Sequence, residues 1–590
     1  MKISALRLRF TRQTQERIAW LLLALLILIY ALVISYLAVL RYDTFKATAF
    51  DLGNMDQVLW NTIHGRPFQF TNQGADWFGP PTRLAIHFEP IIFPLSLLYI
   101  FGADPRILLV FQTLALVSGS LPVFLLTRKY LPAWPLLSPM MALVYLLMPA
   151  LLSLNIFDFH PVSLATPLLL YAVLALTYGR YVWFLIACVL AASCKEDIPL
   201  SIAMFGILVI WMYKLPRLGT VLIVGGLIWS LLAFLVIIPH FYPGAQHNNY
   251  WYRYEALGSS PGAAIINLLL HPWLLFTTFI TLDRLYYLAN LLRGGGFLAL
   301  LAPEWLLPAL PSLAVNLLST DPLLYSGVFH YNAAIIPFIL LAVIHGTSRF
   351  VSLWQQWRGE AKEHASWRSS IEQFTTMGPS WASKGMPVWL ASLGSNFALL
   401  RSNVVQSVAV HPAFTRSTAF IQPRLTRLAH TGNYQWQRFS ERLTPLAITT
   451  SAARLQWFIY GWLIVMMALN FVIMSPALNA FWPDHLPGTR EQHIQQLLSM
   501  IPPNASVSAG SNLNPHLSER LYVTVFPAIT FSSSEKSINN TVQYVIVDLQ
   551  AVFPEDQVGT ANELNQLINS KQFRVLARAE GVILLVRRRL

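Results

Sequence analysis

Acidic and imidazole side chains gather in three short polar stretches of an otherwise apolar chain. They are Asp51, Asp56, His64, His87 and Glu89 in the stretch 42–90, Asp158 and His160 in 155–161, and Lys195, Glu196 and Asp197 within the apolar run 181–213. Carboxylates and imidazoles take up and release protons, and both also bind metal ions. These residues are therefore candidates for general acid–base catalysis or metal binding, although no His or Cys spacing among them specifies a metal site.

Each candidate also has a structural interpretation. Asp51 precedes the segment LGNMDQVLW, so its side chain is in position to cap a short helix at the membrane interface. His87 and Glu89 are two residues apart and cannot share one helix face, and in a loop they would simply hydrogen-bond the backbone. Asp158 and His160 have the same spacing, which suits a turn with a local Asp–His hydrogen bond. Capping and catalysis by Asp51 do not exclude each other.

The composition of the rest of the chain indicates whether these groups belong to a soluble protein or to a membrane protein. Of 590 residues, 55% are hydrophobic and only 11% are charged, which lies outside the range of soluble globular proteins. Repeated apolar runs of about 20 residues match helices that cross a hydrocarbon layer about 30 Å thick. The net charge of +13 sits in short clusters between these runs, as the positive-inside rule predicts, so nucleic acid is not an expected partner.

These runs predict an all-α, multi-pass membrane protein with about eleven transmembrane helices and a small C-terminal α/β domain outside the cytoplasm. The first run, 18–40, follows a basic N-terminus and precedes no cleavage site, so we expect an uncleaved span with the N-terminus in the cytoplasm. This orientation places 42–90 outside. We divide the chain into a core at 1–345, a basic insert at 346–454, a last span at 455–475 and an outer α/β domain at 476–590.

The run 181–213 is predicted to be a hairpin of two helices, because basic residues flank both of its ends. Each arm has about 14–16 residues, or roughly 21–24 Å, which falls short of the hydrocarbon core. The charged tip at Lys195, Glu196 and Asp197 should therefore lie beneath the outer surface, where ionisable groups need partners. It is either part of a functional site or an internal ion pair that stabilises the hairpin.

Two further apolar segments depart from straight spans. Residues 297–318 contain Pro303, Pro308 and Pro311, so we expect a broken helix, which membranes tolerate only where protein or a cavity covers the backbone. Residues 262–279 suit a helix that lies along the outer interface.

The basic insert and the C-terminal region suggest partners. Residues 346–454 contain twelve Lys or Arg and four Asp or Glu, interleaved with Trp, so they either lie against anionic lipids or form a solvated loop. Residues 476–590 carry no nucleotide loop, G-x-S-x-G or metal motif, so docking or substrate recognition is expected there. Other membrane proteins are further candidate partners of both regions.

Several motifs together resemble a known bacterial family. They are FDLGNMDQVLWNTIHGRPF, RLAIHFEPIIFPLSLLY, NIFDFHP, CKEDIPL, LLAPEWLLPALPSLAVNLLS and NPHLSER. The family they resemble comprises predicted membrane proteins of unknown function (DUF type), and it is grouped by fold with the C-type (GT-C) glycosyltransferases. The match runs over most of the chain and fails mainly at the insert 346–454.

This resemblance implies sugar transfer at the outer face of the bacterial cytoplasmic membrane. C-type enzymes use polyprenyl-phosphate sugar donors and carry an essential acid in the first outer loop, where Asp51 fits best and Asp56 is the nearest rival. Such an acid acts as general base on the acceptor hydroxyl, in a single displacement that inverts the anomeric carbon. We assign substrate binding to His87, Glu89, Asp158, His160, Lys195, Glu196 and Asp197.

The leaving phosphate in such a reaction needs positive charge or a metal ion. The candidates for that charge are Lys195, Arg83, His87 and His160. Some relatives use a divalent cation, which Asp51 with Asp158 or Glu89 would hold through oxygen ligands. No other cofactor is implied.

Two other functions fit the same sequence. A transporter or lipid flippase also has broken helices and buried charges, but it predicts a site near mid-membrane and internal repeats. A non-catalytic subunit of a membrane complex predicts that the polar residues can be changed freely. The glycosyltransferase predicts an acidic site facing outward, with a polyprenyl-phosphate sugar and membrane lipids as partners.

Overall fold

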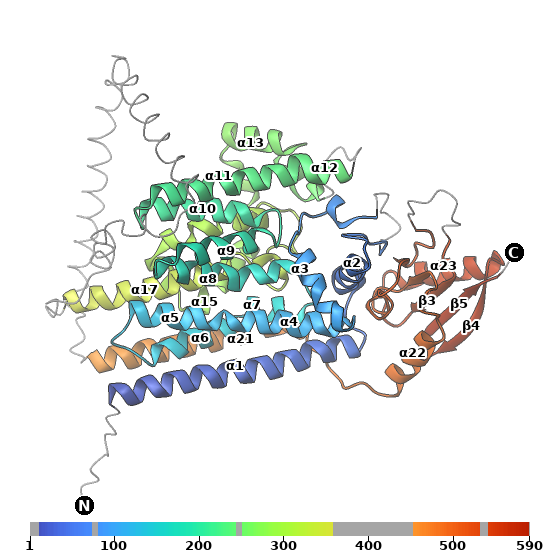
Figure 1. Cartoon of the computed structure of the whole chain (residues 1–590), viewed down its shortest axis with the longest axis horizontal. Helices are drawn as coiled ribbons and strands as arrows, with labels where there is room; N and C mark the ends of the chain where they lie inside the picture. The colour runs from blue at the N-terminus through green and yellow to red at the C-terminus, as the bar shows by residue number, and fades with distance from the viewer. Residues whose placement is uncertain (1–10, 73–80, 243–249, 358–451, 532–540, 589–590) are drawn as a thin grey trace, which may run out of the picture. The chain divides into compact units, whose positions relative to one another are not determined.

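The computed structural model describes residues 11–72, 81–242, 250–357, 452–531 and 541–588 (Figure 1). The chain divides into two compact units, of which the smaller consists of Met212–Lys214 and Phe350–Leu455. The larger unit contains both the outer loop after the first helix and the C-terminal domain. The predictions for the basic insert 346–454 lie outside the described residues except at its two ends.

Within the described ranges, five helical stretches are long and apolar enough to cross a membrane. They are α1 (Arg12–Asp43), α4 with α5 (Pro105–Ser118 and Ser120–Tyr130), α11 through η5 to α12 (Pro216–Leu232, Ala233–Ile237 and Ile238–Phe241), α17 (Ile336–Trp357) and α21 (Ala452–Asn479). A pair bent by 50°, α6 (Leu137–Leu146) and α7 (Pro149–Ile156), makes a sixth if it is counted as one span. Three shorter apolar helices occupy other predicted spans, namely α8 (Ala165–Thr177), α9 (Tyr181–Ala192) and α10 (Ile198–Trp211).

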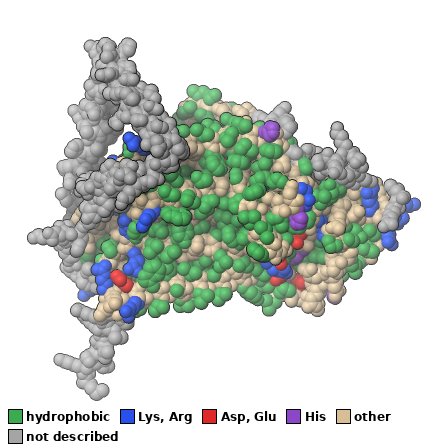
Figure 2. All heavy atoms as spheres, in the orientation of Figure 1, with side chains coloured by type: hydrophobic (Ala, Val, Ile, Leu, Met, Phe, Trp, Pro, Cys, Tyr) green, Lys and Arg blue, Asp and Glu red, His purple; other side chains and the backbone are tan. Residues whose placement is uncertain are grey.

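The surface of these helices is apolar, which is the reverse of a soluble protein. On α1, Leu21 and Leu32 are 69% and 63% exposed, whereas Leu23 and Ile34 are buried against neighbouring helices. Exposing such side chains to water is unfavourable, so these faces suit contact with lipid tails. Figure 2 shows hydrophobic side chains over most of the helical part. The prediction of a mostly helical, multi-pass membrane protein is confirmed, with five or six apolar spans in the described ranges.

The loop between α1 and α4, predicted to lie outside, folds into short helices. They are the π-helix η1 (Ala49–Gly53), α2 (Asn54–Ile63), η2 (Arg83–Ala85), α3 (Ile92–Ser96) and η3 (Leu97–Phe101). Nearly every residue of α2 is buried, including the polar Asp56, Gln57 and Asn61. A helix buried on all sides must find partners for its polar side chains, so α2 is a structural element of the core rather than a surface helix.

The hairpin predicted at 181–213 is present, because α9 ends at Ala192 and α10 begins at Ile198. Behind it, α10 lies very close to α11. A Cβ atom on Gly206 would approach the carbonyl oxygen of Gly219 to 2.6 Å, so the two helices touch through their backbones. Within a membrane, the burial of apolar surface gives helices little driving force to associate. Small residues at such a crossing allow the close packing that stabilises the pair instead.

The remaining helical segments of the larger unit outside the C-terminal domain are short, and several of them are 3-10 helices. They are η4 (Pro161–Leu164), η6 (Trp251–Leu257), α13 (Pro261–Leu270), α14 (Leu274–Thr278), α15 (Leu282–Arg293), η7 (Leu298–Leu301), η8 (Pro303–Ala309), α16 (Leu310–Leu317) and η9 (His330–Asn332). The broken helix predicted at 297–318 is therefore confirmed. Pro303 starts η8 and Pro308 lies inside it, and each removes a backbone donor that an α-helix would need.

The C-terminal domain is a five-stranded mixed sheet with two helices. Its elements are α22 (Thr489–Ser499), β1 (Val507–Ala509), η11 (Asn514–His516), β2 (Val523–Val525), β3 (Tyr544–Asp548), α23 (Gln557–Asn569), β4 (Phe573–Ala579) and β5 (Val582–Arg587). The strand order is β2-β1-β3-β5-β4, in which β1 is parallel to both neighbours and β5 is antiparallel to both. The predicted α/β domain is confirmed. The apolar segments RLYVTVFP, YVIVDL, FRVLARAE and GVILLVRR predict four of these strands from the sequence, and β1 is the strand that the sequence did not indicate.

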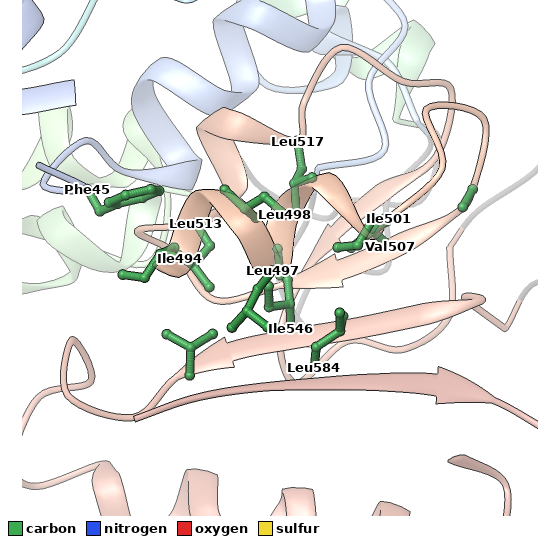
Figure 3. Packing of buried hydrophobic residues seen from close by; sticks show 13 residues of the cluster. Phe45, Ile494, Leu497, Leu498, Ile501, Val507, Leu513, Leu517, Ile546 and Leu584 are labelled. Atoms are coloured by element: carbon green, nitrogen blue, oxygen red, sulfur yellow. The ribbon is translucent and has the colours of Figure 1, made fainter. Parts of the chain in front are cut away.

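Two apolar clusters hold this domain together, one on each face of the sheet. Side chains of α22, including Ile494 and Leu497, pack in the first cluster with β1, β3 and β5 (Figure 3). Leu564 of α23 belongs to the second cluster with residues of β3, β4 and β5. Phe45, from the loop that follows α1, is also a buried member of the first cluster (Figure 3). The C-terminal domain therefore includes a side chain from the opposite end of the chain in its core.

Candidate functional site

Asp51 lies within η1, three residues before Asn54, the first residue of α2. The residue at the N-cap position of α2 is Gly53, and no side chain caps that helix. The Asp51 carboxylate instead makes two side-chain hydrogen bonds, with His160 Nε2 at 2.8 Å and with Thr48 Oγ1 at 2.9 Å. The capping interpretation of Asp51 is therefore wrong, because the π-turn separates its carboxylate from the first amides of the helix.

Thr48 joins Asp51 to a second carboxylate. The Thr48 hydroxyl lies 2.8 Å from Asp158 Oδ2 as well as 2.9 Å from Asp51 Oδ2, and the Thr48 amide also donates to Asp158 at 2.8 Å. Arg41 of α1 approaches the other Asp158 oxygen at 3.5 Å. The local Asp158–His160 bond expected from the sequence is not formed, because Asp158 takes a left-handed φ of 49° and bonds Thr48 while His160 bonds Asp51.

A hydroxyl carries one proton, so Thr48 cannot donate to two ionised carboxylates at once. The directions of the pKa shifts indicate which of the two carboxyl groups is ionised. Burial raises the pKa of Asp158, and Asp51 raises it further, more than Arg41 and Thr48 lower it. Burial also opposes ionisation of Asp51, but the charge and hydrogen bond of His160 outweigh it, so the pKa of Asp51 is lowered. Asp51 is thus the ionised member and Asp158 favours its protonated form, with Arg41 balancing the single negative charge.

His160 is stacked on a second imidazole. Its ring centroid lies 4.0 Å from that of His330, with 22° between the planes. Among the described residues, Nδ1 of each ring has no hydrogen-bond partner although both atoms are buried. Burial, and then the charges of His160, Lys195, His87 and Arg83, lower the pKa of His330, which keeps this ring neutral. Two unsatisfied ring nitrogens beside an ionised carboxylate are expected at a site that binds a polar ligand.

The second part of the cluster consists of paired opposite charges. Arg83 donates to Glu89 at 2.7 Å, and His87 Nδ1 lies 2.8 Å from Glu196 Oε1. Glu196 also accepts from the backbone amide of Phe88 at 3.1 Å. The predicted backbone bonding of His87 and Glu89 is therefore wrong, since both pair with side chains. The bond to Glu196 instead joins the first outer loop to the tip of the hairpin.

The rest of the hairpin tip lies in the same neighbourhood. Lys195 Nζ and Asp197 Oδ1 are 3.9 Å apart, with side chains 18% and 19% exposed, so the tip does not project into bulk water. Their pairing agrees with the internal ion pair considered from the sequence. Because Lys195 contributes to the lowered pKa of His330, the tip lies within electrostatic range of the His160–His330 stack.

Asp56, the predicted rival of Asp51, lies in a different environment. It is fully buried, and its two carboxyl oxygens each form a hydrogen bond of 2.5 Å, one with the hydroxyl of Tyr99 of η3 and one with that of Ser518 of the C-terminal domain. Burial and the charge of Glu519 raise its pKa well above the ordinary range. His64 is also separate, with Nδ1 2.6 Å from the Trp60 carbonyl oxygen one turn earlier in α2. The structure therefore places neither residue with Asp51.

The divalent cation remains a prediction. In the described part of the chain, no three His, Cys, Asp or Glu side chains are grouped as metal ligands. Asp51 and Asp158 are bonded to Thr48, His160 and Arg41, and Glu89 is paired with Arg83. These carboxylates are therefore already engaged by other groups of the described chain, and no step proposed below uses a metal.

Three residues of the cluster were not singled out from the sequence. Thr48 stands three residues before Asp51, a spacing that suits a local hydroxyl–carboxylate bond and was available as a signal. His330 lies in the outer segment FHYN, where an imidazole could have been added to the candidates. Arg41 belongs to the apolar α1, and no sequence pattern links it to Asp158.

Comparison with known proteins places the chain in a family. No curated protein matches it. A crystal structure of ArnT from Cupriavidus metallidurans bound to undecaprenyl phosphate is similar, with 13% identity, a TM-score of 0.40, and coverage of 95% of this chain and 97% of that chain. The apo structure of the same protein gives 13% identity, a TM-score of 0.42, and coverage of 96% and 98%.

The family model described as "Predicted membrane protein (DUF2079)" matches residues 41–369 and 402–584. The unmatched segment 370–401 lies within the basic insert 346–454, where the motif resemblance also fails. The family resemblance inferred from the motifs is thereby confirmed. This chain belongs to the DUF2079 family of predicted membrane proteins.

Proposed function

We propose that this protein transfers a sugar from a polyprenyl-phosphate donor to an acceptor hydroxyl, with Asp51 as the general base. The observation that carries the proposal is the state of Asp51. It is the ionised member of a carboxylate pair, and its side chain is 24% exposed, whereas that of its partner His160 is 10% exposed. A general base must be both unprotonated and within reach of the hydroxyl that it deprotonates.

In this reaction the Asp51 carboxylate takes the proton of the acceptor hydroxyl. The acceptor oxygen forms a bond with the anomeric carbon as the bond from that carbon to the phosphate oxygen breaks. The products are the glycosylated acceptor and polyprenyl phosphate, and the proton remains on Asp51 until solvent removes it. His160 donates Nε2–H to Asp51 and so orients the carboxylate.

The positive charges needed by the leaving phosphate come from Arg83, His87 and Lys195. All three lie close enough to the His160–His330 stack to influence the pKa of His330, after the larger effects of burial and His160. Each is paired with a carboxylate, so the site is close to neutral before a ligand binds. A phosphate would supply a second negative partner for these cations and for the unsatisfied Nδ1 of His330.

The proposal includes a C-type arrangement of the membrane part. The shorter apolar helices α8, α9 and α10, together with the more polar α15 and the broken segment 297–318, would complete about eleven crossings. The N-terminus would lie in the cytoplasm, and the loop with Asp51 and the C-terminal domain would lie outside. The support for this arrangement is the motif resemblance together with the distribution of Lys and Arg between the apolar runs.

Sugar transfer in reconstituted membranes tests the proposal, with polyprenyl-phosphate sugars as donors. Asp51→Asn should reduce transfer at least about a hundredfold, because the amide cannot accept the proton. Asp283→Asn, the same change at an exposed carboxylate of α15, should transfer at the parental rate. Asp56→Asn tests the rival directly, since loss of transfer there with full activity of Asp51→Asn would move the base to Asp56.

Two outcomes would remove the proposal. If Asp51→Asn transfers at the parental rate, Asp51 is not the general base. If the parent protein transfers no sugar from any donor, the transporter or the non-catalytic subunit becomes the better description.

A further inference from the structure

The turn that carries Asp51 is attached to the C-terminal domain rather than to the membrane helices alone. η1 packs against η11, and the Ala49 amide donates to Ser511 Oγ at 3.3 Å. These residues are separated by 462 positions in the sequence. A backbone amide of the turn is thus bonded directly to the domain, two residues before the proposed base.

A reciprocal pair of amide side chains lies behind the same turn. Asn72 Nδ2 donates to Asn514 Oδ1 at 2.6 Å, and Asn514 Nδ2 donates to Asn72 Oδ1 at 2.7 Å. Asn72 Nδ2 also donates to the carbonyl oxygen of Ala49 at 3.2 Å, inside η1. Both side chains are buried, so the two bonds are shielded from water and fix the geometry of the pair.

Gly53, the last residue of η1, shows how closely the pair is packed. A Cβ atom at this position would lie 2.5 Å from Asn514 Oδ1 and 2.8 Å from Asn72 Nδ2. The backbone of Gly53 has φ −62° and ψ −39°, which any residue adopts. Glycine is therefore required here because the amide pair leaves no space for a side chain, and not because of the backbone conformation.

The contact continues along α2 and the end of the loop. Gln57 donates to the carbonyl oxygens of Arg520 and Leu521 at 3.0 and 3.2 Å, while its own carbonyl accepts from the amides of Thr71 and Asn72. Thr71 Oγ1 accepts from the amide of Val523 at 3.0 Å, at the start of β2. The outer loop is bonded to the edge of the sheet at several points.

At the other end of the turn, aromatic contacts complete the attachment. Phe45 lies in the core of the domain, and its ring centroid is 4.3 Å from that of His516 in η11 (Figure 3). His516 stacks on Tyr42 at 4.0 Å and bonds the Tyr42 carbonyl oxygen at 3.1 Å. Residues on both sides of Asp51 therefore contact the same short segment of the C-terminal domain.

We propose that η11 of the C-terminal domain sets the position of Asp51, with Asn514 as the central positioning residue. The domain is then an integral part of the site, and not only the docking or recognition module expected from its lack of motifs. The catalytic consequence rests on the proposed function, but the positioning itself does not. A displacement of about 1 Å at a general base lowers the rate up to about a hundredfold, so a residue that touches no substrate has a large effect here.

Hydrogen exchange measures the positioning without any assay of activity. Asn514→Ala should speed the exchange of the amides of 49–57 at least about tenfold, while amides of β3 keep the parental rate. Asn512→Ala is the matched control, because this residue has the same side chain two positions earlier and donates to Asp548 within the domain. Unchanged exchange at 49–57 in Asn514→Ala overturns the inference, whatever the enzyme does.

Gly53→Ala provides a second route that leaves Asn514 in place. The added methyl group should displace the amide pair and produce the same faster exchange at 49–57. Gly225→Ala is its control, since a Cβ atom there meets no atom within 4 Å. If Asn514→Ala does not fold, Gly53→Ala carries the test, and parental exchange in that variant overturns the proposal.

Kinetics distinguish positioning from general stability, provided that the parent transfers sugar. Asn514→Ala should lower kcat about ten- to hundredfold and leave the donor KM within about twofold, because the phosphate-binding cations are untouched.

The double variant with both Asn72→Ala and Asn514→Ala should lose no more of kcat than either single variant, because the two changes break the same hydrogen-bonded pair. Equal losses in kcat and in the amount of folded protein would show a purely structural role. Absence of transfer by the parent removes the proposed function and leaves the exchange result to decide this inference.

Discussion

Asp51 and Asp56 stand five residues apart in one loop, yet their surroundings are opposite. Asp51 faces His160, is partly exposed, and has a lowered pKa because the charge of His160 outweighs its burial. Asp56 has no exposed surface, meets two hydroxyl groups, and has a raised pKa because of burial and the nearby Glu519. One carboxyl group is therefore prepared to accept a proton, and the other already holds one.

This difference shows what residue type and loop position could not reveal, namely the surroundings that separate Asp51 from its rival Asp56. Both residues fit the rule of an acid soon after the first span, and only their partners separate them. A neutral carboxyl group between Tyr99 and Ser518 can donate one hydrogen bond and accept another, which makes it a link between η3 and the C-terminal domain. Burial and charge thus leave one of two neighbouring carboxyl groups ionised and make the other a neutral link between elements.

The largest effect on stability should follow from Asp56→Ala. This change removes both hydrogen bonds and leaves the hydroxyls of Tyr99 and Ser518 buried without their partner, so we expect a loss of about 2–4 kcal/mol. Asp56→Asn should cost less than about 1 kcal/mol, because the amide reproduces one donor and one acceptor of the neutral acid. Thermal unfolding of the purified protein in detergent measures both.

The contrast between these two variants is the informative result. Equal destabilisation by Asn and Ala would mean that Asp56 is ionised in the folded protein. In that case the two carboxyl groups would no longer differ in protonation, and the comparison with Asp51 would fail.

A smaller, pH-dependent effect is expected at Glu519, whose charge contributes to the raised pKa of Asp56. Burial and the charge of Asp104 raise the pKa of Glu519 to about 7, although Arg520 opposes them. A carboxyl group with a raised pKa in the folded state contributes stability below its ordinary pKa of 4.5, and this contribution is lost as pH rises to about 7. Glu519→Gln should therefore be more stable than the parent at pH 8, by on the order of 1–3 kcal/mol, and equal to it near pH 4.

The measurement is the difference in melting temperature between Glu519→Gln and the parent across this pH range. Glu563→Gln, at an exposed position of α23, is the control and should show no pH-dependent difference. A variant that is less stable than the parent at pH 8 would show that Glu519 forms a favourable charged interaction there.

Most helices and strands could be predicted from the sequence, but the contacts between them could not. Long apolar runs indicated the spans, the prolines at 303 and 308 indicated the broken helix, and the charged tip with short arms indicated the hairpin. These features depend on local composition, which hydropathy records directly. β1 was missed because a strand of three residues, Val-Ser-Ala, is too short to show alternation.

The pairings within the site could not be read in this way. His160 bonds Asp51 and His87 bonds Glu196, and each pair is separated by 109 residues. The local partners expected from spacing were wrong because tertiary packing brought stronger ones within reach. Spacing along the chain limits which side chains share an element, but it gives no information on which elements meet.

The smallest effect on stability should come from Asp51→Asn, the change expected to abolish transfer. Asn keeps Oδ1 as acceptor for His160 and turns Nδ2 toward Thr48, whose single proton then goes to Asp158, so every bond in the group is retained. What is lost is one partly exposed ion pair, for which we expect less than about 1 kcal/mol. Because the pKa of Asp51 is lowered by folding, this difference from the parent should be present at pH 7, should shrink below the ordinary pKa of 3.8, and should be lost as pH falls through the lowered pKa of the folded state. Thermal unfolding of Asp51→Asn and the parent at both pH values measures this difference in stability. A loss of stability well above about 1 kcal/mol would make Asp51 a structural residue like Asp56. A loss of transfer in the variant could then be attributed to unfolding.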